Sequence, residues 1–316
     1  MGDNLVNTVI LLAVYNGASH LPELLDSLRC QTDPAFSVLM QDDGSEDDSP
    51  AILQKIHAAD PRFSFGREGG QHLGAAGNFC SLIRQCVHAD RILLCDQDDV
   101  WEPEKIARLH SAMDLLEQSH GRDIPLLVHS DCSLISEGGD LMGNSFFRHQ
   151  GWNPEALTLP PLLVQNNVTG CTTMMNEPLR ALVASHARAR DLFMHDWFIA
   201  LTAASFGKIA FVNEPLTRYR QHDGNAIGAS SRSLLQRALS ALGQRQEARR
   251  RIRLTYTHAK VFRKLYGEEL PLPALSIVNA YLATEHMRKI PRLLSVRRLG
   301  CLMQNPVTRL GQMLFG

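Results

Sequence analysis

The sequence predicts an α/β protein with a mostly parallel sheet flanked by helices and followed by a helical extension. In the first 227 residues, short apolar runs alternate with segments whose leucines recur at helical spacing. Several apolar runs end in clusters of polar and acidic residues. The formal charge also reverses along the chain, from −13 through Ile227 to +12 after it. This reversal indicates two regions with different electrostatic roles.

The first elements alternate between strand and helix. Val9–Val14 is a near-continuous apolar run, typical of a strand buried on both faces, and Tyr15-Asn16-Gly17 predicts a turn after it. Leucines at helical spacing then predict a helix over Leu21–Leu28. Phe36–Gln41 is the next predicted strand, and Ile52–Ile56 lies in the next predicted helix. This order favours parallel strands joined by right-handed crossovers.

The same reasoning extends to the end of the chain. Residues 136–165 are expected to form a long loop with a short helical piece, because glycine and proline pairs interrupt them. From Ser230 onward the sequence is predicted to be helical. The intervening predicted elements are strands at Phe63–Phe65, Ile92–Cys95, Leu126–His129 and Lys208–Val212, and helices at Asn78–Val87, Pro103–Leu116, Glu177–His186 and Phe198–Phe206. Pro215–Arg220 is interpreted as the segment that leads to Gln221-His222-Asp223-Gly224-Asn225.

An acidic stretch, Asp96-Gln97-Asp98-Asp99, follows the predicted strand at Ile92–Cys95. Ligands of open α/β sheets bind outside the carboxyl ends of the strands. Asp96 and Asp98 are two residues apart and can point to the same side of an extended segment. Such a pair can hold a divalent cation, which in turn can hold a diphosphate. The alternative interpretation is a solvated acidic turn or the N-cap of the helix that follows.

Three more residues could carry chemistry, and each has a plainer interpretation. Asp42 ends the second predicted strand and could accept a hydrogen bond from a base, or could be an Asx-turn residue. Asp196 opens a helix, whose dipole favours an ionised general base, or it could simply be an N-terminal carboxylate. His222 could be a metal ligand, or an ordinary surface or core histidine.

Several protein classes are disfavoured. The chain has no Walker A loop, no G-x-G-x-x-G after the first strand and no G-x-S-x-G, which argues against P-loop NTPases, nicotinamide dehydrogenases and α/β-hydrolases. Seven scattered cysteines without a C-x-x-C pair favour a reduced, cytoplasmic setting without structural zinc. No apolar run reaches the roughly 18–20 residues that span a bilayer, and the N-terminus does not resemble a signal peptide.

Three motifs in fixed order carry a resemblance to a known family. They are Ala13-Val14-Tyr15-Asn16-Gly17, Asp42-Asp43-Gly44-Ser45 and Asp96-Gln97-Asp98-Asp99-Val100-Trp101. In this order and spacing the chain resembles the family 2 glycosyltransferases, over about residues 8–228. The resemblance implies the Rossmann-like GT-A fold for residues 1–228, with a basic helical region at 229–316.

Later motifs extend this resemblance. Asn166–Asn176, with Gly170, is similar to the family's glycine-containing acceptor loop. His195-Asp196-Trp197 is similar to its base motif, although His195 stands where the family usually has glutamate. The sequences of Asp96–Trp101 and of Tyr219-Arg220-Gln221-His222 are most similar to those of bacterial rhamnosyltransferases.

The resemblance implies a role for each matching residue. Asp196 would be the catalytic base, and Gly170 and Trp197 would lie on the acceptor side. Asp98 and His222 would bind Mg²⁺ or Mn²⁺. The nucleotide-sugar donor would contact Ala13, Tyr15, Asp42, Asp96 and Gln97.

The implied function is inverting transfer of a sugar to a hydroxyl of a growing, lipid-linked surface polysaccharide such as O-antigen or capsule. We expect L-rhamnose from dTDP-L-rhamnose, with a UDP-hexose-dependent family member as the alternative. A nucleotidyltransferase should carry a basic residue in a glycine-rich first loop, and Val14–Ser19 has none. A non-catalytic sugar-nucleotide-binding protein would more readily have lost Asp98 or Asp196.

The region after Ser230 crowds arginine and lysine between apolar residues, as at Arg249-Arg250-Arg251-Ile252-Arg253. A basic amphipathic segment can lie on an anionic membrane, here the inner face of the cell membrane. The alternatives are a solvated helix packed on the catalytic domain and a dimer contact. No nucleic-acid partner is expected, because no RNA- or DNA-binding module is recognisable.

Overall fold

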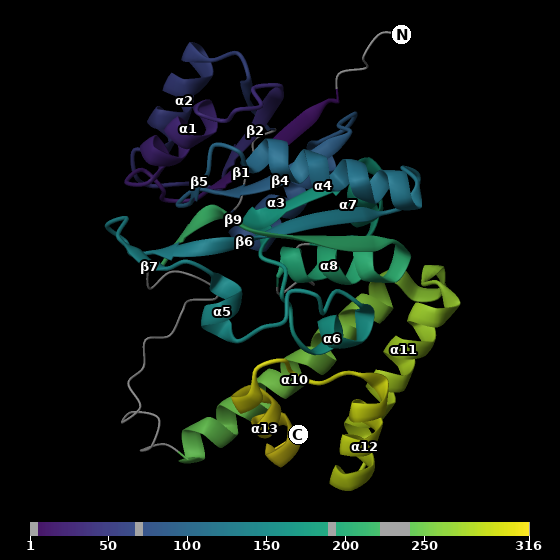
Figure 1. Cartoon of the computed structure of the whole chain (residues 1–316). Coiled ribbons are helices and arrows are strands. Elements are labelled where there is room, and N and C mark those ends of the chain that lie inside the picture. Colours follow the sequence, from purple (N-terminus) through teal and green to yellow (C-terminus); the bar gives the residue numbers. More distant parts are fainter. Residues whose placement is uncertain (1–5, 67–71, 189–193, 222–240, 316) are drawn as a thin grey trace.

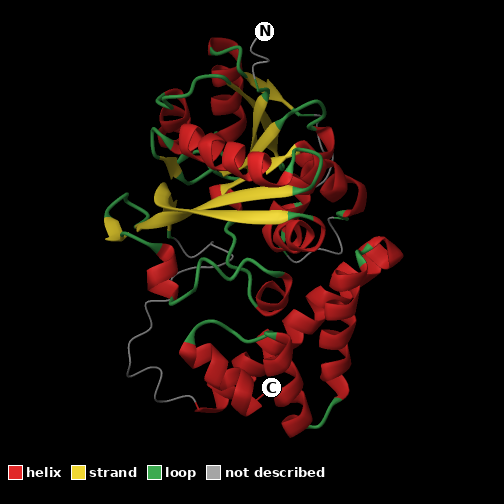
Figure 2. Ribbon diagram, turned by 45° about the vertical axis from the view of Figure 1, so that its right-hand side comes forward, coloured by secondary structure: helices red, strands yellow, loops and turns green. Residues whose placement is uncertain are grey.

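The computed structural model describes residues 6–66, 72–188, 194–221 and 241–315. Figure 1 shows a twisted sheet with helices on both faces in the first two thirds of the chain, and C-terminal helices packed below it. Coloured by secondary structure, the lower part consists of helices and loops, whereas the yellow strands are confined to the upper part (Figure 2). The predicted α/β architecture with a helical C-terminal region is therefore confirmed.

One sheet of nine strands organises the described residues. Its order is β3-β2-β1-β4-β8-β6-β9-β5, and β7 pairs with β6. The strands are β1 (Thr8–Val14), β2 (Phe36–Asp42), β3 (Phe63–Phe65), β4 (Arg91–Asp96), β5 (Val100–Trp101), β6 (Leu126–Ile135), β7 (Leu141–Gly143), β8 (Thr173–Asn176) and β9 (Lys208–Arg220).

The sheet is parallel where the sequence alternates strand and helix. β3, β2, β1 and β4 pair in parallel, and β6 pairs in parallel with β9. Between these halves, β8 is antiparallel to both β4 and β6. β4 and β6 therefore run in the same direction, so their carboxyl ends lie at one edge of the sheet.

Helices cover both faces and enclose two apolar clusters. On one face, α1 (Leu21–Arg29), α2 (Ser49–Ala59) and α4 (Lys105–His120) bury their leucines and isoleucines against the sheet. The other face is covered by α3 (Gly74–Gln85), α7 (Glu177–His186) and α8 (His195–Phe206). Two short helices, α5 (Phe146–Gln150) and α6 (Leu159–Val164), lie in the long connection between β6 and β8.

The C-terminal region is helical, as predicted. It consists of α10 (Ala241–Tyr266), α11 (Leu272–Ala283), α12 (Lys289–Leu299) and α13 (Pro306–Phe315), with 3₁₀ turns at Gly267–Glu269 and Thr284–His286. The inner face of α10 joins the same apolar cluster as α8. The expected division at residues 228 and 229 falls outside the described residues and stays a proposal. No described helix is long and apolar enough to cross a bilayer.

The long strand pair β6 and β9 corrects two predictions. The sequence predicted strands ending at His129 and Val212, but β6 runs to Ile135 and β9 runs through Pro215 to Arg220. Each strand continues because the other pairs with it, which no local pattern reveals. The register shifts near Asp131, opposite Pro215, where a proline is tolerated because the ladder is already irregular.

Candidate active site

The predicted site residues of the three motifs lie on neighbouring strands at the carboxyl edge of the sheet. Ala13 on β1 pairs with Asp96 on β4, and the next residue, Val14, pairs with Asp42 on β2. Because neighbouring strands are about 4.8 Å apart, this register holds Asp42 and Asp96 on opposite sides of β1 at one edge. The sequence motifs are thus brought together by parallel pairing.

Gln97 joins the first and third motifs. Its side-chain amide donates to the Tyr15 carbonyl at 2.7 Å and accepts from the Tyr15 backbone N–H, as a neighbouring strand would. The Gln97 side chain passes directly over Gly17, where an added Cβ would lie 2.8 Å from it. A side chain at position 17 would therefore have to displace the Gln97 side chain. The ring of Tyr15 is exposed and lies beside His72, with the ring centroids 4.3 Å apart.

Asp42 and its neighbour Asp43 accept hydrogen bonds from different segments of the chain. The Asp42 carboxylate accepts hydrogen bonds from the backbone of Gly44 and Ser45 and from the Ser45 hydroxyl, which is the Asx-turn geometry weighed above. Asp43, which the sequence analysis gave no role, is buried and accepts the N–H groups of Leu73 and Gly74, both at 2.8 Å. Asp43 therefore anchors the start of α3 beside the site.

Three carboxylates crowd the turn after β4. Asp96 and Asp98 are half-buried and Asp99 is buried. Burial, together with the charges of Asp99 and Asp98, raises the pKa of Asp96 well above its usual range. Burial and the charge of Asp98 raise the pKa of Asp99 to about 7. Like charges held this close to one another favour proton uptake or a bound cation.

The donor atoms of this turn fit a hard divalent cation. Oxygen atoms of Asp96 and Asp99 and the sulfur of Cys171 lie within 4.8 Å of one another. Burial keeps the pKa of the Cys171 thiol well above its usual range, so the hard carboxylate oxygens are the suitable ligands for Mg²⁺ or Mn²⁺. The predicted ligand Asp98 acts electrostatically on both carboxylates. His222 lies outside the described residues.

Lys105, a residue that sequence reasoning passed over, lies beneath the turn. It is fully buried, its ammonium donates to the carbonyl of Cys171 at 2.5 Å, and it lies 3.4 Å from the centre of the Trp101 ring. Burial lowers the pKa of Lys105 to about 8. A lysine in the first turn of an amphipathic helix gives no sequence indication of this position, because its burial depends on α4 meeting the turn.

Arg220 at the end of β9 holds the carboxylate turn in place. Its buried guanidinium donates to the carbonyls of Asp98 and Glu137 and to the carboxylate of Glu23. One side chain thereby ties the turn after β4 to α1 and to the β6–β7 connection. In the sequence, Arg220 is one residue of the Tyr219-Arg220-Gln221-His222 motif, which gives no indication of burial. Its burial follows from β9 extending past its predicted end.

Asp196 opens α8 on the other face of the same edge. Asp196 is buried, and burial raises its pKa to about 7. Hydrogen bonds from the backbones of Trp197 and Gly170 and from the Asn166 side chain lower the pKa and limit this rise. The Trp197 N–H lies 2.6 Å from its Oδ1. The charge of Asp196 also contributes to the raised pKa of Asp96. The structure thus brings the predicted base close to the predicted metal site.

The residues around Asp196 hold it firmly. Trp197 donates its indole N–H to the carbonyl of Leu162 at 2.6 Å and stacks on His258 of α10. His195 stacks on Phe79 of α3, with the ring centroids 4.2 Å apart. A Cβ added at Gly170 would lie 2.9 Å from His195 Nε2, so this glycine allows the 166–176 segment to approach α8 closely.

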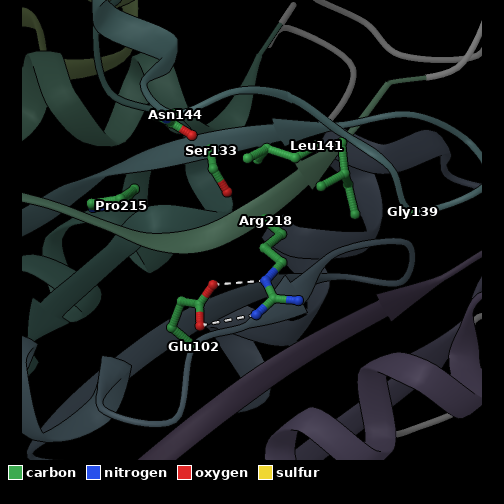
Figure 3. Close-up of a pocket in the computed structure, with 8 residues that line it drawn as sticks. Glu102, Ser133, Gly139, Leu141, Asn144, Pro215 and Arg218 are labelled. Atoms are coloured by element: carbon green, nitrogen blue, oxygen red, sulfur yellow. Dashed lines mark hydrogen bonds and ion pairs between the residues drawn. The ribbon is translucent and has the colours of Figure 1, made fainter.

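A pocket of about 410 Å³ lies near the carboxyl ends of β6 and β9. Figure 3 shows Arg218 and Glu102 paired with each other in its lining, with the arginine Nε 2.7 Å from the carboxylate. The predicted loop 136–165 contributes part of the lining. The lining residues are Glu102, Ser133, Ile135, Gly139, Leu141, Asn144, Pro215 and Arg218.

The chain is similar in sequence to known sugar transferases. Residues 9–119 match the sequence model of glycosyl transferase family 2. The chain is 25% identical over 228 residues to the dTDP-rhamnosyl transferase RfbG of Shigella flexneri, covering 69% of this chain and 74% of that one. It is 36% identical over 129 residues to an undecaprenyl-phosphate 4-deoxy-4-formamido-L-arabinose transferase of Pseudomonas syringae, covering 39% of this chain and 35% of that one.

Solved structures of low sequence identity share the fold. S. aureus TarS 1–349 in complex with UDP-GlcNAc superimposes with a TM-score of 0.58 at 13% identity, over 89% of this chain and 72% of that one. The mannosyltransferase PcManGT from Pyrobaculum calidifontis, in complex with GDP-Man and Mn²⁺, gives 0.53 at 14% identity, over 96% and 78%. The match of residues 9–119 to glycosyl transferase family 2, the relatives and the GT-A-like fold agree with the carboxylates at the sheet edge and support glycosyltransferase activity.

Proposed function

We propose that this glycosyltransferase moves L-rhamnose from dTDP-L-rhamnose to a hydroxyl of a lipid-linked glycan, with inversion at the anomeric carbon. The observation that carries the proposal is that Asp196 accepts the backbone N–H of Gly170, whose neighbour Cys171 has its sulfur within 4.8 Å of oxygen atoms of Asp96 and Asp99. A donor diphosphate and an acceptor hydroxyl can meet between a cation site and a base in this arrangement.

The carboxylate turn is proposed to hold the donor diphosphate. Asp96 and Asp98, with Asp99 behind them, would supply oxygen ligands, and His222 remains a proposed further ligand. A divalent cation bound there supplies compensation for the negative charge that develops on the departing nucleoside diphosphate. Tyr15, with its exposed ring, and Asp42 at the neighbouring strand end are proposed to contact the nucleoside.

Asp196 is proposed to act as the general base. Its Oδ1 accepts the Trp197 N–H, which orients the carboxylate at the start of α8. As the acceptor oxygen bonds to the anomeric carbon, its proton passes to the Asp196 carboxylate and the bond to the diphosphate oxygen breaks. This single displacement turns a β-linked donor into an α-L-rhamnoside. With a pKa raised to about 7, Asp196 can accept a proton near neutral pH.

Two similarities support the finer assignments. RfbG, which is 25% identical to this chain, is named as a dTDP-rhamnosyl transferase. The name of the Pseudomonas relative includes a lipid phosphate, undecaprenyl-phosphate. We therefore favour dTDP-L-rhamnose over a UDP-hexose as donor. We also favour a peripheral position on the inner face of the cell membrane, where a lipid-linked acceptor would be met.

Donor binding tests this proposal directly. The full chain is titrated with dTDP-L-rhamnose, UDP-glucose, UDP-galactose and GDP-mannose by calorimetry, each with Mn²⁺, with Mg²⁺ and with a chelator. Metal-dependent binding of dTDP-L-rhamnose alone is expected. Preference for a UDP-sugar would discard the rhamnose assignment and keep the transferase, whereas binding of none would contradict the proposed donor site. The variant Asp123→Asn serves as a control, because Asp123 is exposed, and it should bind the donor as the parent does.

A further inference from the structure

The last helix presents an uninterrupted apolar stripe to solvent. On α13, Val307, Leu310 and Leu314 recur at helical spacing, and Val307 is 77% exposed. The opposite side of the helix packs inward, since Gln312 is buried and donates to the Cys301 carbonyl at 2.9 Å. A Cβ added at Gly311 would lie 3.4 Å from that of Ala248 on α10, an ordinary contact distance. The helix is thus seated by one face and exposes the other.

The neighbouring helix extends this apolar surface. On α12, Ile290 and Leu294 are four residues apart, and Ile290 is 71% exposed. The Lys289 ammonium donates to the carbonyl of Leu314 at 2.8 Å, which joins the first turn of α12 to the last turn of α13. Both helices lie below the sheet, at the bottom of the view in Figure 1. We name Ile290, Leu294, Val307, Leu310 and Leu314 the C-terminal apolar face.

The segment that carries this face is purely cationic. Residues 286–316 contain six basic residues and no acidic one. Arg297 and Arg298, in the last turn of α12, are exposed and have no acidic partner among the described residues. The six are Arg288, Lys289, Arg292, Arg297, Arg298 and Arg309.

We propose that the C-terminal apolar face docks on an anionic lipid bilayer. Its leucine, isoleucine and valine side chains would enter the boundary between headgroups and acyl chains, and the surrounding arginines would meet the lipid phosphates. This inference rests on the proposed function in one respect, which is that the acceptor is linked to a lipid. It identifies which surface of the chain would face that acceptor's membrane.

The charge pattern favours a bilayer over a second copy of the chain. An isologous dimer would place each copy's C-terminal apolar face against the same face of its partner. The unpaired arginines of α12 would then oppose one another, whereas anionic headgroups neutralise them. Apolar residues with a surplus of cations are typical of helices that lie in a membrane interface.

This surface lies beyond the most basic stretch of the C-terminal region. From the sequence, the region after Ser230 could contact a membrane, pack on the catalytic domain or form a dimer contact, and its most basic stretch, Arg249–Arg253, lies in α10. No large apolar residue is strongly exposed in its described part, and Ile252 and Phe262 are buried against the core. Several α10 cations are also neutralised locally, as where Arg251 and Lys260 pair with Glu247 and Glu285. α10 therefore lacks the apolar half of an interfacial helix.

Vesicle co-sedimentation of the full chain tests the proposal without any sugar nucleotide. Vesicles of phosphatidylcholine, with and without phosphatidylglycerol, are compared for the parent and for Val307→Gln/Leu310→Gln. The matched control is Leu115→Gln, because Leu115 is 65% exposed on α4, far from this face. Substitution of exposed residues by glutamine, a good helix former, should leave the fold intact, which circular dichroism verifies.

We expect the parent to bind the anionic vesicles. The Val307→Gln/Leu310→Gln variant should bind them more weakly by a factor of roughly ten or more. Arg297→Gln/Arg298→Gln should weaken binding by a similar factor in a salt-dependent manner. Leu115→Gln should bind as the parent does, and Arg249→Gln/Arg253→Gln should bind more tightly than the α12 arginine variant.

Three results would overturn the proposal. They are absence of parent binding to anionic vesicles, equal loss in the Leu115→Gln control, and a parent dimer in sedimentation velocity that Val307→Gln/Leu310→Gln dissociates. The last would make a second copy of the chain the occupant of the face. Donor titration without vesicles is measured in parallel, so loss of lipid binding with intact donor binding separates this inference from the proposed transferase site.

Discussion

The sheet edge buries carboxylates, whereas the C-terminal helices expose their cations. At the edge, Asp96, Asp99 and Asp196 are drawn into the protein, and their pKa values are raised because burial disfavours the charged form. In the C-terminal helices, the cations stay at the surface and large apolar residues are exposed. Burying like charges opposes folding, which agrees with the cation proposed for the first region. Exposed cations oppose folding little, and we propose that those of the second region meet anionic lipid.

The largest expected effect tests the buried edge. Asp196→Asn removes the proposed base while keeping its shape, and transfer should fall by roughly 10²–10⁴-fold. Donor binding should survive, because the carboxylate turn is unchanged. Initial rates of transfer and calorimetric donor titration measure both quantities, with the exposed Asp123→Asn as control. Loss of donor binding together with transfer would contradict the role of base.

Two arginines of β9 compare buried with exposed charge inside one strand. Arg220→Met leaves several buried acceptors and Glu23 without their donor, and should lower the free energy of unfolding by roughly 3–5 kcal/mol. Arg218→Met breaks only the surface pair with Glu102 and should lower it by less than about 1 kcal/mol. Urea unfolding of both variants decides this. Equal losses would show that burial is not the deciding difference.

The raised pKa of Asp196 should appear in the pH dependence of stability. Its ordinary value is 3.8 and its value in the folded protein is about 7, so between these pH values the folded state binds more protons than the unfolded state. This carboxyl therefore destabilises the fold progressively as pH rises from about 4 to about 7. Without metal, Asp196→Asn should be more stable than the parent by on the order of 2–4 kcal/mol above pH 7.

The comparison of Asp196→Asn with the parent is made by urea unfolding at several pH values. Because both proteins contain the same buried histidines, their own pH dependence cancels in the difference. The advantage of the variant should shrink as pH falls and vanish below about pH 4. A difference that does not change with pH would show that Asp196 titrates in its ordinary range.

The smallest expected effect concerns metal binding at the carboxylate turn. Asp98→Asn should weaken Mn²⁺-dependent donor binding by at least about tenfold and leave metal-independent binding unchanged. Asp140→Asn is a matched control, because Asp140 is exposed on the β6–β7 connection. Calorimetric titration with and without chelator gives both values. An unaffected Asp98→Asn variant would move the proposed cation to Asp96 and Asp99 alone.

Much of the site could be predicted from the sequence because strand ends and helix starts are local features. The apolar run before Asp96 and the helix that opens at Asp196 both appear where periodicity placed them. What local pattern could not predict was burial that depends on distant partners. Lys105 lies under the turn because α4 meets it, and Asp43 anchors α3 across the loop.

By itself, the sequence determined the alternation of strands and helices, the carboxylates at the strand ends and the reversal of charge after Ile227. Only the tertiary structure decided that β6 and β9 pair along their length, that Arg220 is thereby buried, and that α12 and α13 expose their apolar sides. The physical reason is range. Backbone propensity and periodicity act over a few residues, whereas pairing and burial depend on residues far apart in the chain.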